Sequence, residues 1–244
     1  MELDGRVVVV TRGITEIGLA LAAGCQKEGA IVVLSDTNEK GLLKIAEETG
    51  IIPMAGSTTQ PPDIKSLVDK TMHRFGRIDL FVSNESLCSS HTSFSNGKEW
   101  NACCQSGLLS QMYAVKYMLP QWVNRKNGYF LTVIPATGLF AEYNLGMYST
   151  LKHPSLSFAE RMAATYGNVG VKVSLFCFEP SVTGLGETIT NNRCSAATLQ
   201  NLAEQLMVGI RQEQFMICLQ KRSKTINTYQ HQLLHHEMYG NIRA

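Results

Sequence analysis

A phenol and an ammonium group lie four residues apart in the second half of the sequence. Tyr148 and Lys152 fall within residues 147–166, a segment that we expect to be a long helix. Residues four apart project from the same face of a helix, so the two side chains are expected to be neighbours. A phenol whose pKa is lowered by a nearby positive charge suits proton transfer to or from a substrate oxygen.

A second candidate group surrounds the first apolar run. Thr11 ends this run, Gly13 follows it, and Gly18 lies near the start of the helical segment that comes next. Glycines in such a loop let the backbone turn tightly and approach a pyrophosphate at the helix N-terminus. Asp36 ends the next apolar run, where a carboxylate in a Rossmann-like site accepts the ribose hydroxyls of NAD and repels a 2′-phosphate. Any bound nucleotide is therefore expected to be NAD(H) rather than NADP(H).

The elements that must position these residues alternate along the chain. Strands are expected at residues 6–11, 30–35, 51–55, 78–83, 128–134, 171–177 and 215–219. Helices are expected at residues 14–28, 39–49, 63–75, 98–125, 147–166, 195–211 and 223–238, with a kink or break at Pro120. Alternating apolar strands and helices predict a single doubly wound, Rossmann-like α/β domain. Its parallel sheet should have about seven strands, with helices on both faces.

Composition excludes several classes of protein. The 244 residues are 44% hydrophobic and 17% charged with a net charge of +2, which argues against a disordered chain and against a nucleic-acid partner. The sequence contains no apolar run of 18 residues and does not begin like a secretory signal, so we expect no membrane span. Seven scattered cysteines predict neither a zinc site nor a disulfide framework and favour a reducing, cytoplasmic location. His231 and His235 have i, i+4 spacing but lack acidic or cysteine partners nearby, so we expect no metal site.

Three motifs together resemble the short-chain dehydrogenase/reductase family. Residues 11–18 (TRGITEIG) are similar to its TGxxxGIG loop, residues 81–86 (FVSNES) stand in place of its NNAG motif, and residues 148–152 (YSTLK) match its YxxxK motif. The resemblance covers roughly residues 3 to 185, the cofactor and catalytic core, and is weaker over residues 186–244, where the family shapes its substrate pocket. It implies an NAD(H)-dependent oxidoreductase for a secondary alcohol or ketone. It also implies a homodimer or homotetramer.

The resemblance assigns roles residue by residue. Tyr148 is the acid/base and Lys152 tunes it, Asn84 holds the central sheet near the cofactor, and Thr183 caps the nicotinamide carboxamide. The cofactor-binding set is Thr11, Arg12, Gly13, Ile17, Gly18, Asp36, Asn84, Tyr148, Lys152 and Thr183.

The same positions depart from the family at several points. Arg12 and Glu16 replace two glycines of the loop, and Gly13, an additional glycine, is expected to rescue the turn. Pro135 replaces the serine that holds the substrate oxygen, and losing such a donor costs about 2.7–4 kcal/mol. Gly107 replaces the asparagine that supports a water chain to the lysine. The remaining departures are Ser57, Glu85, Phe178 and Glu179.

Two functions therefore remain open. The first is a divergent, weakly active NAD-dependent oxidoreductase. The second is a pseudoenzyme that keeps the fold as a binding or partner subunit. A third reading, a halohydrin dehalogenase, requires the serine and an arginine in place of the lysine, whereas this chain has Pro135 and Lys152.

Overall fold

A seven-stranded, wholly parallel sheet forms the centre of the computed structural model, which describes residues 1–84, 97–135, 146–178 and 196–218. The strand order is β3-β2-β1-β4-β5-β6-β7, and every neighbouring pair is parallel. The strands are β1 (Val7–Thr11), β2 (Ile31–Asp36), β3 (Ile52–Ala55), β4 (Leu80–Asn84), β5 (Gly128–Pro135), β6 (Val171–Phe178) and β7 (Met216–Cys218). The expected fold class is confirmed.

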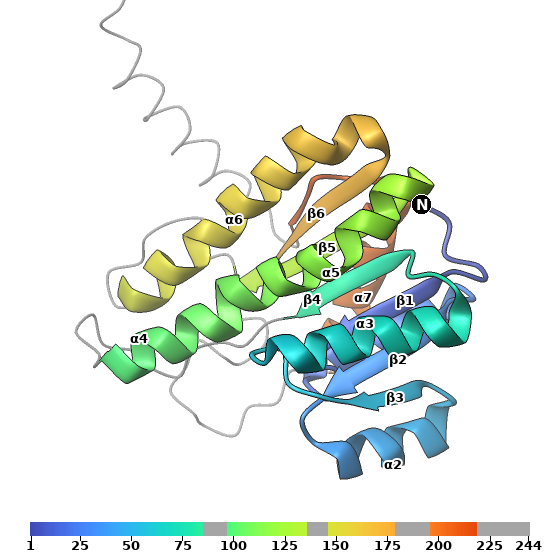
Figure 1. Cartoon of the computed structure of the whole chain (residues 1–244). Coiled ribbons are helices and arrows are strands. Elements are labelled where there is room, and N and C mark those ends of the chain that lie inside the picture. Colours follow the sequence, from blue (N-terminus) through green and yellow to red (C-terminus); the bar gives the residue numbers. More distant parts are fainter. Residues whose placement is uncertain (85–96, 136–145, 179–195, 219–244) are drawn as a thin grey trace, which may run out of the picture.

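Helices cover both faces of this sheet (Figure 1). They are α1 (Glu16–Lys27), α2 (Glu39–Thr49), α3 (Pro61–Phe75), α4 (Gly97–Cys104), α5 (Ser110–Arg125), α6 (Gly146–Tyr166) and α7 (Ala196–Arg211). Helices α1, α2 and α7 contribute to the hydrophobic core on one face, and α3, α5 and α6 contribute to the core on the other. Because the central strands are buried on both faces, β1 consists of four consecutive valines and a threonine, all of them buried.

The long helix before β5 is interrupted, but not where its proline predicts. α5 continues through Pro120 to Arg125, so the expectation of a break at Pro120 is wrong. The interruption is instead the π-helical segment η1 (Gln105–Leu109), which joins α4 to α5 and contains the buried Gly107. A π-helical turn inserts an extra residue without ending the helix, and no composition signal at these residues announces it.

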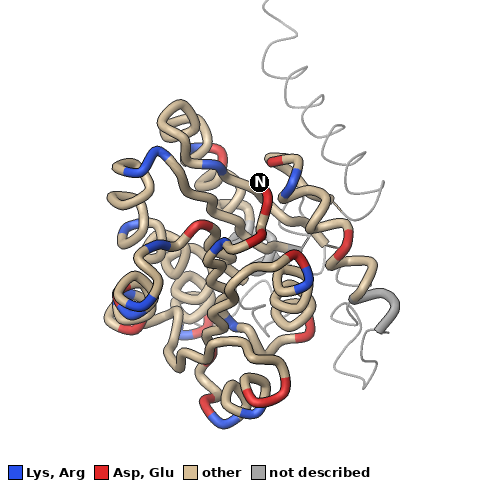
Figure 2. The backbone as a smooth tube through the Cα atoms, turned by 90° about the vertical axis from the view of Figure 1, so that its right-hand side faces the viewer, with Lys and Arg blue, Asp and Glu red and all other residues tan. Residues whose placement is uncertain are grey.

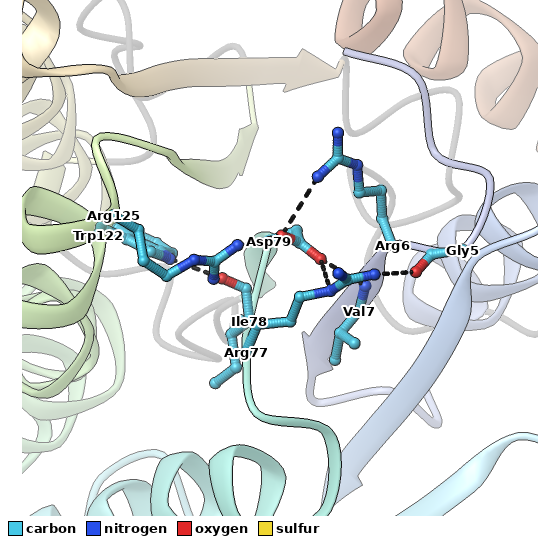
Figure 3. A network of polar contacts seen from close by, with 8 residues as sticks. All are labelled: Gly5, Arg6, Val7, Arg77, Ile78, Asp79, Trp122 and Arg125. Carbon is cyan, nitrogen blue, oxygen red and sulfur yellow. Dashed lines mark hydrogen bonds and ion pairs between the residues drawn. The ribbon is translucent and has the colours of Figure 1, made fainter.

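A buried carboxylate ties together the amino-terminal edge of the sheet (Figure 3). Asp79, just before β4, is fully buried and accepts a hydrogen bond from the backbone N–H of Val7 at 2.9 Å. Three guanidinium groups surround it, with nitrogen–oxygen distances of 3.6 Å for Arg6, 3.0 Å for Arg77 and 2.9 Å for Arg125. The cluster joins β1, β4 and α5 at the edge opposite to the carboxyl ends of the strands.

Replacing Asp79 with leucine is expected to lower the free energy of unfolding by about 3 kcal/mol, because a buried N–H and charge-assisted bonds lose their acceptor. Urea denaturation followed by circular dichroism measures this change. The matched control is Asp69→Asn, which breaks the exposed pair with Lys65 and should cost less than about 1 kcal/mol. Equal costs for the two variants would refute a special role for Asp79.

Charges of both signs are interspersed over the described surface (Figure 2). Among the described helices, none is long and apolar enough to cross a membrane.

Candidate functional site

The order of the strands places a topological switch point between β1 and β4. The chain continues from β1 to β2 on one side and from β4 to β5 on the other, so the connections diverge at the carboxyl ends of these two strands. Open α/β sheets bind their ligands at such a switch point. Thr11 and Asn84 end the two strands, and the predicted cofactor loop begins directly after Thr11.

Asn84 holds the loop against the sheet. Its Nδ2 donates to the carbonyl oxygen of Arg12 at 3.1 Å and to Oγ1 of Thr15 at 2.9 Å. Its backbone N–H donates to Oγ1 of Thr11 at 3.1 Å, and Thr11 donates in turn to the carbonyl of Val82 at 3.2 Å. Thr11 and Asn84, which the sequence placed in the cofactor site, therefore lie together at this switch point.

Thr15 is a loop residue that the sequence reasoning missed. Its Oγ1 accepts from the backbone N–H of Gly18 at 3.1 Å and caps the amino end of α1. The signal was available, since threonine directly before a helical segment is a favoured N-cap.

Glu16 follows in the first turn of α1, where a negative charge is stabilised by the helix dipole. That carboxylate stands at the helix end where a pyrophosphate would bind.

The turn after β1 is made by Arg12 and not by Gly13. Arg12 has φ +46°, in the left-handed region, whereas the φ of Gly13 is not positive. The expectation that Gly13 rescues the turn is therefore wrong. Gly13 is needed for space, since a Cβ there would lie 2.2 Å from the Leu34 side chain. Gly18 is constrained in the same way, because a Cβ there would lie 2.7 Å from the carbonyl oxygen of Arg12. Within the described residues, no ion pair joins Arg12 to Glu16.

Replacing Arg12 with glycine is expected to raise the free energy of unfolding by up to about 1 kcal/mol, because a side chain is disfavoured at this backbone conformation. Urea denaturation measures the gain. Lys126→Gly is the matched control, since Lys126 has φ +52° at the end of α5, far from the loop. A loss of stability in Arg12→Gly alongside a gain in Lys126→Gly would show that the Arg12 side chain makes compensating contacts.

Asp36 is half-buried at the carboxyl end of β2 and contacts the same loop. Its Oδ2 accepts the backbone N–H of Ile14 at 3.2 Å, and its Oδ1 accepts the backbone N–H of Asn38 at 3.1 Å. The N-cap of α2 is Asn38 and not Asp36. Oδ1 also accepts the hydroxyl of Thr37 at 3.5 Å. The Asp36 carboxylate therefore lies beside the loop, and its Oδ2 can accept a further bond.

A second carboxylate lies beside the segment that follows β3 and was also missed. Asp63, in the first turn of α3, accepts the backbone N–H of Ser57 at 2.9 Å. Ser57 is one of the departures from the family pattern, and it stands where the resemblance implies an acid near the adenine. The fold brings an acid to Ser57 from six residues further on. The distance of Asp63 from β3 along the sequence could not reveal this contact. Asp63 reaches Ser57 only because α3 begins at Pro61 and its first turn lies against the segment after β3.

The predicted catalytic pair lies at the start of α6. Tyr148 and Lys152 lie four residues apart near its amino end, where their spacing predicts that they share a helix face. Pro135 is the last residue of β5 and pairs in register with Phe178 at the end of β6. Gly107 lies in η1, which packs against α6. Thr183, Glu85 and Glu179 lie outside the described residues.

The described cysteines differ in whether they are disulfide-bonded and in the pKa of their thiols. Cys103 of α4 is disulfide-bonded, so the expectation of a chain without disulfides is wrong at this position. Burial raises the pKa of the Cys25 thiol to about 12, with a smaller contribution from Glu28. A hydrogen bond to Cys218, together with burial, raises the pKa of Cys177 well above its usual range. Cys25 and Cys177 therefore remain protonated at neutral pH and are poor nucleophiles.

The whole arrangement can be compared with known proteins. A family model described as short chain dehydrogenase matches residues 6–193, more than three quarters of the chain. The chain belongs to the short-chain dehydrogenase family. This is a family of oxidoreductases, and the resemblance of the three motifs is confirmed.

Relatives and solved structures agree with this assignment. An uncharacterized oxidoreductase of Staphylococcus saprophyticus is 25% identical over 185 residues, 71% of this chain and 77% of the relative. The 12alpha-hydroxysteroid dehydrogenase of a Clostridium species is 26% identical over 188 residues, 71% of this chain and 72% of the relative. A short-chain dehydrogenase/reductase of Burkholderia phymatum, crystallised in complex with NAD, has a TM-score of 0.82 at 19% identity, covering 97% of this chain and 96% of its own. The apo form of LigO from Sphingobium has a TM-score of 0.84 at 17% identity, covering 100% of this chain and 92% of its own. At these identities the structures show the fold alone.

Proposed function

We propose that this short-chain dehydrogenase is an NAD(H)-dependent oxidoreductase that acts slowly on a secondary alcohol or ketone. Tyr148 transfers a proton to or from the substrate oxygen while hydride moves between substrate and nicotinamide. Lys152 lowers the pKa of this tyrosine through its positive charge. Asp36 selects NAD over NADP, and Thr183 orients the nicotinamide. The turnover is slow because Pro135 provides no hydroxyl for the substrate oxygen and Gly107 provides no amide.

The position of Asp36 carries the proposal. Its carboxylate lies at the carboxyl end of β2, beside the loop that follows β1, and is bonded to the N–H of Ile14. A carboxylate at this place accepts ribose hydroxyls and repels a 2′-phosphate. Thr11, Gly13, Ile17, Gly18 and Asn84 are all buried around the same loop. The Burkholderia relative binds NAD on the same fold.

Titration with NADH and NADPH, followed by calorimetry, tests the proposal. NADH is expected to bind with a Kd below about 100 μM, which corresponds to about 5.5 kcal/mol, and NADPH at least tenfold more weakly. Asp36→Asn should reduce this discrimination, because it removes the charge that repels the 2′-phosphate. The control is Glu39→Gln, which removes an exposed acid three residues away and should leave both affinities unchanged. No binding of either nucleotide at millimolar concentration would refute the oxidoreductase.

Glu16 favours a second candidate, a pseudoenzyme that serves as a binding or partner subunit. Its carboxylate lies in the first turn of α1, and Thr15 already caps this helix end. A negative charge there opposes the approach of a pyrophosphate. Under this alternative, Glu16→Gly would create nucleotide affinity that the natural protein lacks. Under the oxidoreductase proposal it would only strengthen binding that already exists.

The remaining expectations join the proposal. We propose that the chain forms a single cytoplasmic domain and assembles as a homodimer or homotetramer through its long helices. Met112 of α5 is 44% exposed, as expected of a residue that a second copy would cover. Light scattering at micromolar concentration should give the mass of a dimer or tetramer, and a monomeric mass would refute the assembly.

A further inference from the structure

Two polar side chains are buried together between α5 and α6. Nε2 of Gln111, in the first turn of α5, donates a hydrogen bond of 3.1 Å to Oγ of Ser155 on α6. Both residues have 0% of their surface exposed. Oε1 of Gln111 is buried as well, and no described group bonds to it.

Most of the buried residues around this pair are apolar. They are Ala114 and Val115 on α5 and Leu156 and Ala159 on α6, whereas the buried Ser110 next to Gln111 donates its own hydroxyl to the carbonyls of Ser106 and Gly107. A buried acceptor without a partner costs about 1–3 kcal/mol, whereas an apolar pair of similar shape would cost nothing. The pair is therefore a poor choice for stability alone. The usual partner of such an atom is an ordered buried water.

The pair also has a defined position relative to the predicted catalytic residues. Ser155 lies seven residues after Tyr148 and three after Lys152, so all three share one face of α6. Gln111 lies four residues after Gly107, which contributes no side chain to η1, and η1 packs against α6. The amide of Gln111 is thus one turn from the place where Gly107 leaves an amide missing.

We infer that Gln111 and Ser155 are positioning residues for the Tyr148–Lys152 turn of α6. Their hydrogen bond sets the position of α6 against η1 and α5, and Oε1 of Gln111 holds an ordered buried water one turn away from Gly107. This inference rests on the proposed function, since positioning the pair matters only if Tyr148 and Lys152 react.

Kinetics of matched variants test the inference. Gln111→Met keeps the length of the side chain and removes the amide, and Ser155→Ala removes the hydroxyl. Each should lower kcat by up to about 100-fold through misplacement of the reacting groups, while the Kd of NADH stays unchanged. The double variant should be no slower than the slower single variant, because the two residues act as a unit. Ser155→Thr, which keeps a hydroxyl, should retain the natural kcat.

The control lies on the same helix. Gln121 of α5 also has a buried Oε1 to which no described group bonds, but it lies ten residues beyond Gln111. Gln121→Met should leave kcat unchanged. If Gln111→Met has the same kcat as Gln121→Met in a protein that binds NADH, the inference is overturned while the proposed function stands.

Crystal structures provide a readout that needs no turnover. The natural protein should show a water within hydrogen-bond distance of Gln111 Oε1. Gln111→Met should lack this water and show a displaced Tyr148–Lys152 turn, whereas Gln121→Met should not. An unmoved turn in Gln111→Met would overturn the inference, whether or not NADH binds. Failure of NADH to bind the natural protein would refute only the proposed function.

Discussion

Replacing Tyr148 with phenylalanine is expected to lower kcat by about 10²- to 10⁴-fold, the usual contribution of a positioned acid/base. The phenol oxygen is the only atom removed, so the helix and the nucleotide site should be unaffected. The measurement is the rate of NADH oxidation with the best ketone from a substrate screen, together with the Kd of NADH. The Kd should stay within about twofold of the natural value, since the change removes an interaction made chiefly in the transition state.

Tyr166→Phe is the matched control for this prediction. Tyr166 ends the same helix, 18 residues further on, and packs against the core formed by α3, α5 and α6. Its replacement removes the same atom from the same element, so kcat should not change. Equal turnover by the natural protein and Tyr148→Phe would show that inherited Tyr148 is not used, and this result would support the partner-subunit alternative.

Replacing Pro135 with serine is expected to raise kcat by about 10²- to 10³-fold, which is the value of one donor to the reacting oxygen. Pro135 ends β5, at the carboxyl edge of the sheet, and stands 13 residues before Tyr148. Proline has no N–H and no hydroxyl, so it cannot stabilise a substrate oxygen in any conformation. Under the proposed function, a hydroxyl at this position would supply the hydrogen bond to the substrate oxygen that proline lacks.

Pro135→Ala separates the hydroxyl from the backbone effect. Alanine restores the N–H and frees φ as serine does, but it adds no side-chain donor. We expect Pro135→Ala to stay within about threefold of the natural kcat, because the side-chain donor is the larger contribution. A gain of equal size in both variants would mean that the rigidity of proline, and not the missing hydroxyl, limits turnover.

Much of the architecture could be predicted without coordinates. Continuous apolar runs such as residues 7–10, alternating with helical segments, predict parallel strands buried on both faces, and all seven expected strands are present. The reason is that each strand of a doubly wound sheet is covered on both faces and therefore consists largely of apolar residues, which can be recognised strand by strand. The joint spacing of the loop, Asn84 and Tyr148 likewise sufficed for the family, because each motif follows a strand or occupies a helix at a set place.

Backbone conformation and long-range contacts could not be predicted in this way. Residue types suggested that Gly13 would make the turn after β1, but Leu34 occupies the space beside Gly13 and Arg12 takes the left-handed conformation instead. Pro120 suggested a break in the long helix, but α5 continues through Pro120. The interruption is at η1, which comes before α5.

The sequence by itself determined the order of the elements, the class of the sheet, and the spacing that puts Tyr148 and Lys152 on one helix face. Only the tertiary structure decided which distant residues meet: Asn84 with Thr15, Asp63 with Ser57, and Gln111 with Ser155. Hydrophobic periodicity is a local property of the chain, whereas a polar contact between two elements depends on how those elements pack. The proposed chemistry would depend on both, since the motifs would supply its reacting groups and the packing would set their positions.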